Sequence, residues 1–186
     1  MSERKVVHEG KYLRMVVQGH WEYVERTHAG GLAAIIVAMT PDDRILFVEQ
    51  FRIPLQQKAI ELPAGLVGDI DAGESIEQSA IRELEEETGW RAARAEVLFI
   101  GPTSAGLTNE RIAYVRACDL EQTGEGGGDE TEDIVVHAVP RAEAPAWLMR
   151  KAREGYALDA KLWTGLWLVD RDPDGSPAGS GKTRRA

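Results

Sequence analysis

The sequence has few of the features that mark membrane, secreted or nucleic-acid-binding proteins. Its single cysteine, Cys118, excludes an internal disulfide and suits a reducing compartment. No apolar run approaches the roughly 18 residues of a membrane span. The first residues, MSERKVVHEGK, lack the apolar core of a signal peptide. We therefore expect a cytoplasmic, soluble protein without a membrane partner.

Positive charge is also scarce. The chain has 22 Lys and Arg against 31 Asp and Glu, which gives a net charge of -9 and a pI near 5.0. General affinity for nucleic acid depends on clustered Lys and Arg that neutralise phosphates, so we expect no nucleic acid partner. An acidic protein that handles a phosphate-containing substrate would need metal ions to do so.

The 186 residues, 43% of them hydrophobic, provide one domain of ordinary size with a sizeable core. Short alternating segments between residues 5 and 26 predict small antiparallel strands. Longer apolar patterns predict strands over 30–39, 45–51, 95–101, 111–120 and 133–140, and helices over 142–155 and 158–169. With a further helix near the centre, this order predicts an α/β fold in which helices enclose a mixed β-sheet.

The central helix is predicted by its end signals. Ser75 followed by Gln78 fits a capping box, and Gly89 is a natural residue just past a helix end. Between them Ile76, Ala80, Ile81 and Leu84 form an apolar stripe at helical spacing. The helix should therefore dock on the core and present its other faces to solvent or to a site.

This helix ends in RELEEETG, residues 82–89. At about 100 degrees per residue, Glu83, Glu86 and Glu87 share one side, whereas Glu85 points roughly the other way. Carboxylates on a rigid element suit Mg²⁺, and Arg82 at i,i+4 could hold Glu86 in place. On composition alone, a solvated acidic face explains the same run.

The longer pattern resembles a known family. Gly68, five residues, Glu74, seven residues and then RELEEETGW over 82–90 match the Nudix box at every fixed position. This resemblance implies a Nudix α/β/α sandwich with a mixed β-sheet. It also implies hydrolysis of a nucleoside diphosphate linked to another group, with Mg²⁺ or Mn²⁺ as cofactor. We expect an N-terminal β-segment over 1–30, the Nudix domain over 31–170 and a disordered tail over 171–186.

Segments outside the box resemble the branch of ADP-ribose and nucleotide-sugar pyrophosphatases: VEQFRIP, IELPAG, TSAGLTNER, DETEDIVVHAVP and DAKLWTGLWL. The resemblance implies three groups of residues. Metal would be held by Ala64 through its carbonyl and by Glu83, Glu87, Glu86 and Glu132. Substrate would contact Arg52, Glu110, Trp21 and Glu61. Catalysis would involve Glu130 as the base, with Glu86 and Arg82.

Each distant assignment has a simpler alternative. Arg52 also fits a surface arginine at a strand end, and the acidic stretch 129–134 also fits a solvated linker. Its lead-in, 124–128, contains four glycines, which suits a loop that closes on substrate. Trp21 or Tyr23 could stack on a nucleobase, or be an ordinary strand aromatic.

Two departures from the family pattern affect the details. Gly65 of LPAG lies three residues before Gly68, the first glycine of the box, and we interpret this as an insertion after Gly65. Ala105 stands where many ADP-ribose hydrolases have proline. ADP-ribose is therefore one candidate substrate, and GDP-mannose and other nucleotide sugars are alternatives.

Two other functions are alternatives to nucleotide-sugar hydrolysis. An inactive Nudix domain could act as a nucleotide sensor or binding module, although the intact set of Glu83, Glu86 and Glu87 argues against it. Hydrolysis of RNA caps or dinucleoside polyphosphates would be favoured by a basic surface, which this acidic chain lacks. The resembled branch also implies a homodimer with exchanged N-terminal strands, because a small sheet of this kind is marginal alone.

Overall fold

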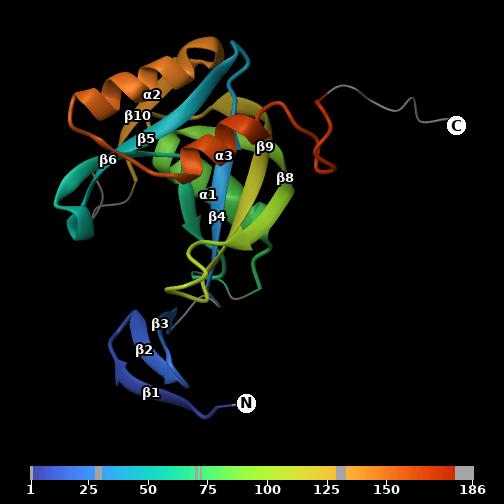
Figure 1. The fold of residues 1–186 in the computed structure, drawn as a ribbon. Coiled ribbons are helices and arrows are strands. Elements are labelled where there is room, and N and C mark those ends of the chain that lie inside the picture. The colour runs from blue at the N-terminus through green and yellow to red at the C-terminus, as the bar shows by residue number, and fades with distance from the viewer. Residues whose placement is uncertain (1, 28–30, 70, 72, 129–132, 179–186) are drawn as a thin grey trace, which may run out of the picture.

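The computed structural model describes residues 2–27, 31–69, 71, 73–128 and 133–178. These residues form three β-sheets and three α-helices (Figure 1). One sheet has the order β7 (Ala64–Leu66), β4 (Leu32–Ala38), β9 (Arg111–Gln122) and β8 (Trp90–Pro102). A second has the order β10 (Val135–Pro140), β5 (Arg44–Arg52), β6 (Gln57–Glu61) and β11 (Ala157–Leu158). The helices are α1 (Ile76–Thr88), α2 (Ala144–Arg153) and α3 (Lys161–Leu168).

Both four-stranded sheets are mixed. Strand β4 runs parallel to β9 and antiparallel to β7, and β11 runs parallel to β6 in a sheet whose other pairs are antiparallel. Parallel neighbours need crossover connections, which the helices supply. The structure therefore confirms the predicted α/β fold with mixed sheets between helices.

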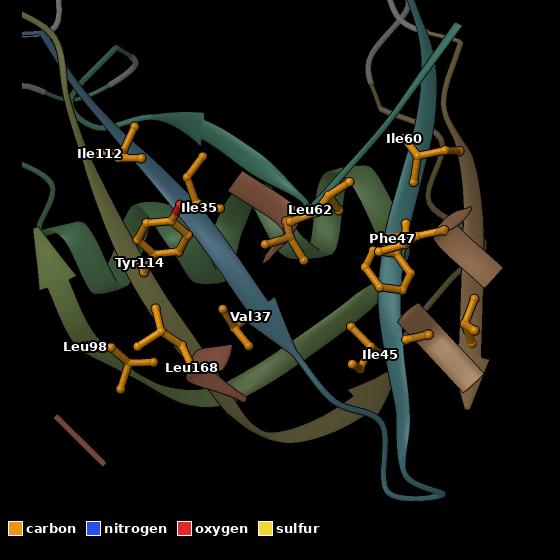
Figure 2. Close-up of a cluster of buried hydrophobic side chains, with 14 residues drawn as sticks. Ile35, Val37, Ile45, Phe47, Ile60, Leu62, Leu98, Ile112, Tyr114 and Leu168 are labelled. Carbon is orange, nitrogen blue, oxygen red and sulfur yellow. The ribbon is translucent and has the colours of Figure 1, made fainter. Parts of the chain in front are cut away.

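Strand β4 separates two apolar layers because its side chains alternate between the faces of the sheet. Ile35 and Val37 join a cluster that includes Phe47 of β5 and residues of α2 and α3. Figure 2 shows this layer between the strands. Ala34 and Ile36 face the other way, toward a cluster that contains Leu84 of α1. Helices thus cover both faces of β4, and the apolar side of α1 is packed against the core.

The ends of α1 agree with the sequence signals. Ser75 caps the helix by accepting a hydrogen bond from the backbone N–H of Gln78, and the Gln78 side chain accepts one in return from the N–H of Ser75. Gly89 adopts the left-handed conformation and donates its N–H to the carbonyl of Glu85. The capping box and the glycine cap are both confirmed.

The N-terminal residues form a separate three-stranded antiparallel sheet of β1 (Arg4–Glu9), β2 (Leu13–Gln18) and β3 (Trp21–Arg26). In Figure 1 this sheet stands apart from the two larger ones. It contacts the rest through the 103–110 connection, where the N–H of Val24 donates to the carbonyl of Leu107 at 2.9 Å. The expected antiparallel N-terminal segment is present.

Several elements differ from the sequence-based expectations. Strand β8 begins at Trp90, directly after the helix, rather than at residue 95. Two short strands, β6 and β7, flank Pro63 where no strand was predicted. Where a disordered tail is predicted from 171, residues 171–178 form a turn in which the N–H of Ala178 donates to the carbonyl of Asp170. Residues 179–186 lie outside the described residues. Among those described, no helix is long and apolar enough to cross a membrane.

Candidate metal and diphosphate site

Three of the five predicted metal ligands, Ala64, Glu83 and Glu87, meet where α1 lies against the start of β7. We call this start of the strand, which follows Pro63, the Ala64–Gly65 turn. Pairing of Ile35 with Ala64 and a hydrogen bond from the N–H of Ile36 to the carbonyl of Pro63 hold this turn on β4. The N–H of Ala64 donates to Oε2 of Glu87 at 3.1 Å. Glu87 is thereby buried, with 4% of its surface exposed, yet its carboxylate has a partner.

Glu83 lies against Gly65, the residue after Ala64. A Cβ atom placed on Gly65 would stand 1.9 Å from Cδ of Glu83, so only glycine allows this approach. The structure thus brings Ala64, Glu83 and Glu87 together. It also places Gly65, not Gly68, beside the acidic helix, which supports an insertion after Gly65.

Arg82 organises the remaining acids of the box. Its guanidinium makes two hydrogen bonds to Glu74, at 3.1 and 3.2 Å, and Nη1 lies 3.0 Å from both Glu83 Oε1 and Glu86 Oε2. Donation of these hydrogen bonds to the Glu74 carboxylate raises the pKa of Arg82 above its ordinary value. The predicted i,i+4 pair with Glu86 is confirmed. Glu74, for which the sequence suggested no role, anchors Arg82 from the start of the box.

The other two glutamates of the run have different surroundings. Glu86 is half exposed and, among the described contacts of its side chain, pairs with Arg82. Glu85 accepts a hydrogen bond from Oγ1 of Thr123 and lies 3.6 Å from Arg91, on another side of the helix. The expected divergence of Glu85 from its neighbours is therefore present.

The chemistry of this donor set fits a divalent cation. Burial raises the pKa of the Glu83 carboxyl to about 7, and Arg82 offsets only part of that effect. A cation beside Glu83 would favour its ionised form at neutral pH. Within the described residues, no three acidic, histidine or cysteine side chains are placed to hold a metal by themselves. Mg²⁺ commonly takes only one or two carboxylates and completes its shell with water and substrate phosphates.

A cavity of about 480 Å³ opens beside this turn, and its lining includes Ala64 and Gly65. Arg52 and Glu61, both predicted to contact substrate, line it as a pair. Nε of Arg52 donates to Oε1 of Glu61 at 2.8 Å, and Nη2 donates to Oε2 at 2.5 Å. This fork is the geometry with which arginine also binds phosphate.

Two further ion pairs line the same cavity. Glu110, a predicted substrate contact, accepts hydrogen bonds from Arg26 Nε at 2.5 Å and from Thr103 Oγ1 at 3.1 Å. At the start of α3, Lys161 pairs with Asp159 through Nζ, and its backbone N–H donates to Oδ1 of Asp159 at 2.8 Å. Sequence reasoning missed Arg26, Asp159 and Lys161 as cavity residues. The DAK stretch was noticed as part of the resemblance and was the available signal for two of them.

Trp21 does not line this cavity. It is half exposed and borders a second hollow of about 490 Å³, together with Tyr23, Thr108 and Asn109. The 103–110 connection contributes residues to both hollows. A role for Trp21 therefore requires a substrate that extends past this connection. Glu130 and Glu132, the predicted base and fifth metal ligand, lie outside the described residues.

The fold and the acidic helix define a member of the Nudix class. A model of the NUDIX domain matches residues 30–159, and this chain belongs to that family. The resemblance inferred from the box is therefore confirmed.

Curated relatives support the same assignment. The chain is 34% identical over 134 residues to an ADP-ribose pyrophosphatase of Bacillus subtilis, covering 72% of this chain and 68% of that protein. It is 34% identical over 125 residues to a methanol dehydrogenase activator of Bacillus methanolicus, covering 67% and 65%. An ADP-sugar pyrophosphatase of Mus musculus is 31% identical over 125 residues, covering 59% and 56%. The aligned part thus spans roughly half to two thirds of these relatives' own lengths.

The fold also agrees with a solved structure. A crystal structure of an ADP compounds hydrolase superposes with a TM-score of 0.70, covering 90% of this chain and 89% of that chain at 21% identity. At this identity the likeness establishes the fold alone.

Replacement of Glu87 by Gln tests the metal site. Gln keeps an oxygen for the N–H of Ala64 but removes the negative charge, so we expect the fold to survive and Mn²⁺ affinity to fall by at least about tenfold. Isothermal titration of the substrate-free protein with Mn²⁺ measures this directly. Glu85→Gln, two residues earlier in α1 and facing Thr123, is the matched control and should bind Mn²⁺ like the wild type. Equal affinities for all three proteins would exclude Glu87 as a ligand.

Proposed function

We propose that the chain is a metal-dependent Nudix pyrophosphatase that hydrolyses the diphosphate of ADP-ribose or a related nucleoside diphosphate sugar. The products would be a nucleoside monophosphate and a sugar phosphate. The observation that carries this proposal is the contact of Glu83 and Glu87 with the Ala64–Gly65 turn, at the wall of a cavity lined by Arg52. The two carboxylates thus lie behind a stretch of backbone that shares the cavity with Arg52, the proposed phosphate contact.

The charge of the cavity supports dependence on a metal. Arg26, Arg52 and Lys161 contribute three positive charges, and each is paired with a carboxylate that also lines the cavity. Among the described lining residues, positive and negative charges therefore balance, and Glu83 and Glu87 add negative charge next to Ala64 and Gly65. A diphosphate would therefore be repelled unless divalent cations neutralise part of its charge.

The proposed residues have three roles: binding the metal, contacting the substrate and acting as the general base. Glu83, Glu87 and the carbonyl of Ala64 would hold Mg²⁺ or Mn²⁺, with Glu86 and Glu132 as further ligands proposed from the sequence. The bound cation would neutralise the bridged phosphates and lower the pKa of the attacking water. Arg82 holds Glu83 and Glu86 in place, and Arg52 would add fixed positive charge at the phosphates. Glu130 is the proposed base on sequence grounds alone.

The substrate class rests on the relatives and on the shape of the site. Two relatives are named ADP-ribose and ADP-sugar pyrophosphatases, which favours an adenosine diphosphate sugar over GDP-mannose. The second hollow at Trp21 and Tyr23 offers aromatic surface for a nucleobase at the other side of the 103–110 connection. Glu61 and Glu110 could accept hydrogen bonds from sugar hydroxyls once the phosphates draw their cationic partners away.

The name of one relative supports a second candidate function, regulation of another enzyme. The chain is as similar to a protein named methanol dehydrogenase activator as it is to the ADP-ribose pyrophosphatase of Bacillus subtilis. A Nudix protein that binds nucleotide and regulates another enzyme is therefore the alternative from a different class. Absence of turnover with retained nucleotide binding would favour it.

We further propose a cytoplasmic homodimer in which the N-terminal strands are exchanged. The small sheet supports this because it stands apart from the larger sheets and exposes apolar side chains, including Val7, Leu13 and Met15. Exchange would cover that surface with the second chain.

A screen of nucleotide sugars with Mg²⁺ tests the activity. We expect ADP-ribose to give AMP and ribose 5-phosphate, identified by mass, with slower turnover of GDP-mannose. Glu87→Gln should lose most of this activity. If no diphosphate is hydrolysed with any divalent metal ion, the proposed activity is excluded. Binding of nucleotide by the intact protein would then test the alternative function as a regulator.

Arg52→Lys tests the role of the paired arginine. Lysine keeps the charge but cannot form the fork that binds two oxygens, so we expect KM for the best substrate to rise about tenfold with a smaller change in kcat. Arg44→Lys, at the opposite end of β5 and paired with Asp42, is the control and should leave both constants unchanged. An unchanged KM in Arg52→Lys would exclude Arg52 as a contact of the phosphates.

Light scattering during gel filtration tests the dimer. We expect a mass twice the 20.5 kDa of one chain, and a monomeric mass after removal of residues 1–27. A monomeric full-length chain at micromolar concentration would rule out the exchange.

A further inference from the structure

The segment 123–128, with the sequence TGEGGG, is tied to the end of the acidic helix. Its first two residues donate their N–H groups to the carbonyl of Gly89, at 2.8 and 3.1 Å. Gly127 donates to the carbonyl of Glu87 at 2.9 Å, and Gly128 to that of Glu86 at 3.1 Å. The segment is largely exposed, yet four backbone hydrogen bonds fix it to one helix end.

Contact, rather than freedom of motion, explains the glycine at its centre. Gly126 has a φ of 71°, and a Cβ atom there would stand 2.4 Å from the carbonyl carbon of Thr88. Backbone thus lies directly on backbone, which no residue with a side chain permits. Gly124 differs, because a Cβ atom on it would meet nothing within 4 Å.

The bonded carbonyls belong to residues of the proposed metal site. The last carbonyls of an α-helix have no partner within the helix and carry partial negative charge. Here those of Glu86 and Glu87 would add to the charge of the carboxylates on the same residues. The N–H groups of Gly127 and Gly128 satisfy them and offset that charge.

Glu87 is consequently held from two sides. Its carbonyl accepts from Gly127, and its carboxylate accepts from the N–H of Ala64 on the opposite strand. The position of the carboxylate relative to the Ala64–Gly65 turn depends on both contacts. If the glycine segment detached, the last turn of α1 could fray and Glu87 would lose its fixed geometry.

We infer that residues 123–128 form a positioning element of the metal site, in which Gly126 lets the segment dock on α1 and hold Glu87 against the turn. The inference rests on the metal-dependent function proposed above. It assigns the glycines before the acidic stretch to site geometry, whereas the sequence had suggested a flexible lead-in to a closing loop.

Gly126→Ala tests this inference, with Gly124→Ala as the matched control. The first change introduces a clash with Thr88, and the second adds the same methyl group to open space in the same segment. For the substrate-free proteins, titrated with Mn²⁺, we expect Gly126→Ala to weaken binding about tenfold, as for other residues that orient metal ligands. Gly124→Ala should match the wild type. Circular dichroism should report a folded protein for both.

Activity provides a second readout. In Gly126→Ala we expect the Mn²⁺ concentration for half-maximal activity to rise, while kcat at saturating Mn²⁺ stays near that of the wild type. A purely structural lesion would instead lower activity at every Mn²⁺ concentration, with unchanged Mn²⁺ affinity, and would overturn the inference. The same holds if both alanine variants weaken Mn²⁺ binding equally.

Failure of the metal site and failure of the positioning role give different results. If the wild type itself binds no Mn²⁺, the proposed metal site fails, whereas wild-type binding with an unaffected Gly126→Ala defeats only the positioning role. Should Gly126→Ala not fold, Thr123→Val serves in its place, because it deletes the Oγ1 hydrogen bonds to Glu85 and Gly89 with little change in volume. A weaker Mn²⁺ affinity of the folded Thr123→Val protein supports the inference, and an unchanged affinity contradicts it.

Discussion

The contact between the end of α1 and the Ala64–Gly65 turn determines the geometry of the whole site. Glu83 lies directly on Gly65, and the N–H of Ala64 holds the carboxylate of Glu87. The turn is itself fixed on β4, and α1 is fixed by Leu84 in the core, so neither partner can shift alone. Two rigid elements thus place the carboxylates against Ala64 and Gly65, which line the cavity. Catalytic sites need this precision because a displacement of about 1 Å can cost a hundredfold in rate.

Crowding negative charge at this contact is tolerable because several groups compensate it. Arg82 contacts Glu74, Glu83 and Glu86 at once. The glycine segment supplies N–H groups to the carbonyls at the helix end. Even so, burial raises the pKa of Glu83 to about 7, so the compensation by protein groups is incomplete. A divalent cation would supply the positive charge that the protein groups lack. The acidic end of α1 would then be stabilised by the same ion that it binds.

The sequence predicts the features that depend on local interactions, but not those that depend on contacts between distant segments. The helix and its caps follow from Ser75, Gln78 and Gly89, which are local signals, and the Nudix box supplied the family. The strands β4 and β9 follow from their apolar runs. The pairing of Arg52 with Glu61, and the approach of Lys161 to the same cavity, depend on how separate elements pack, and no local pattern encodes that. The contacts of the glycines at 124–128 with α1 were out of reach for a similar reason: composition shows that a segment can bend, but not what it contacts.

The balance of charge in the cavity also links the two binding events. Each described cation that lines it has a carboxylate partner, so the phosphates of the proposed substrate would have to displace Glu61, Glu110 or Asp159 or bring their own counterions. A divalent cation held by Glu83 and Glu87 would supply positive charge both to these carboxylates and to the phosphates. Metal and substrate should therefore each raise the affinity of the other by the same factor, since such coupling is reciprocal. Carboxylates released from their arginine partners would then be free to accept hydroxyl groups, which ties recognition of a sugar to capture of its diphosphate.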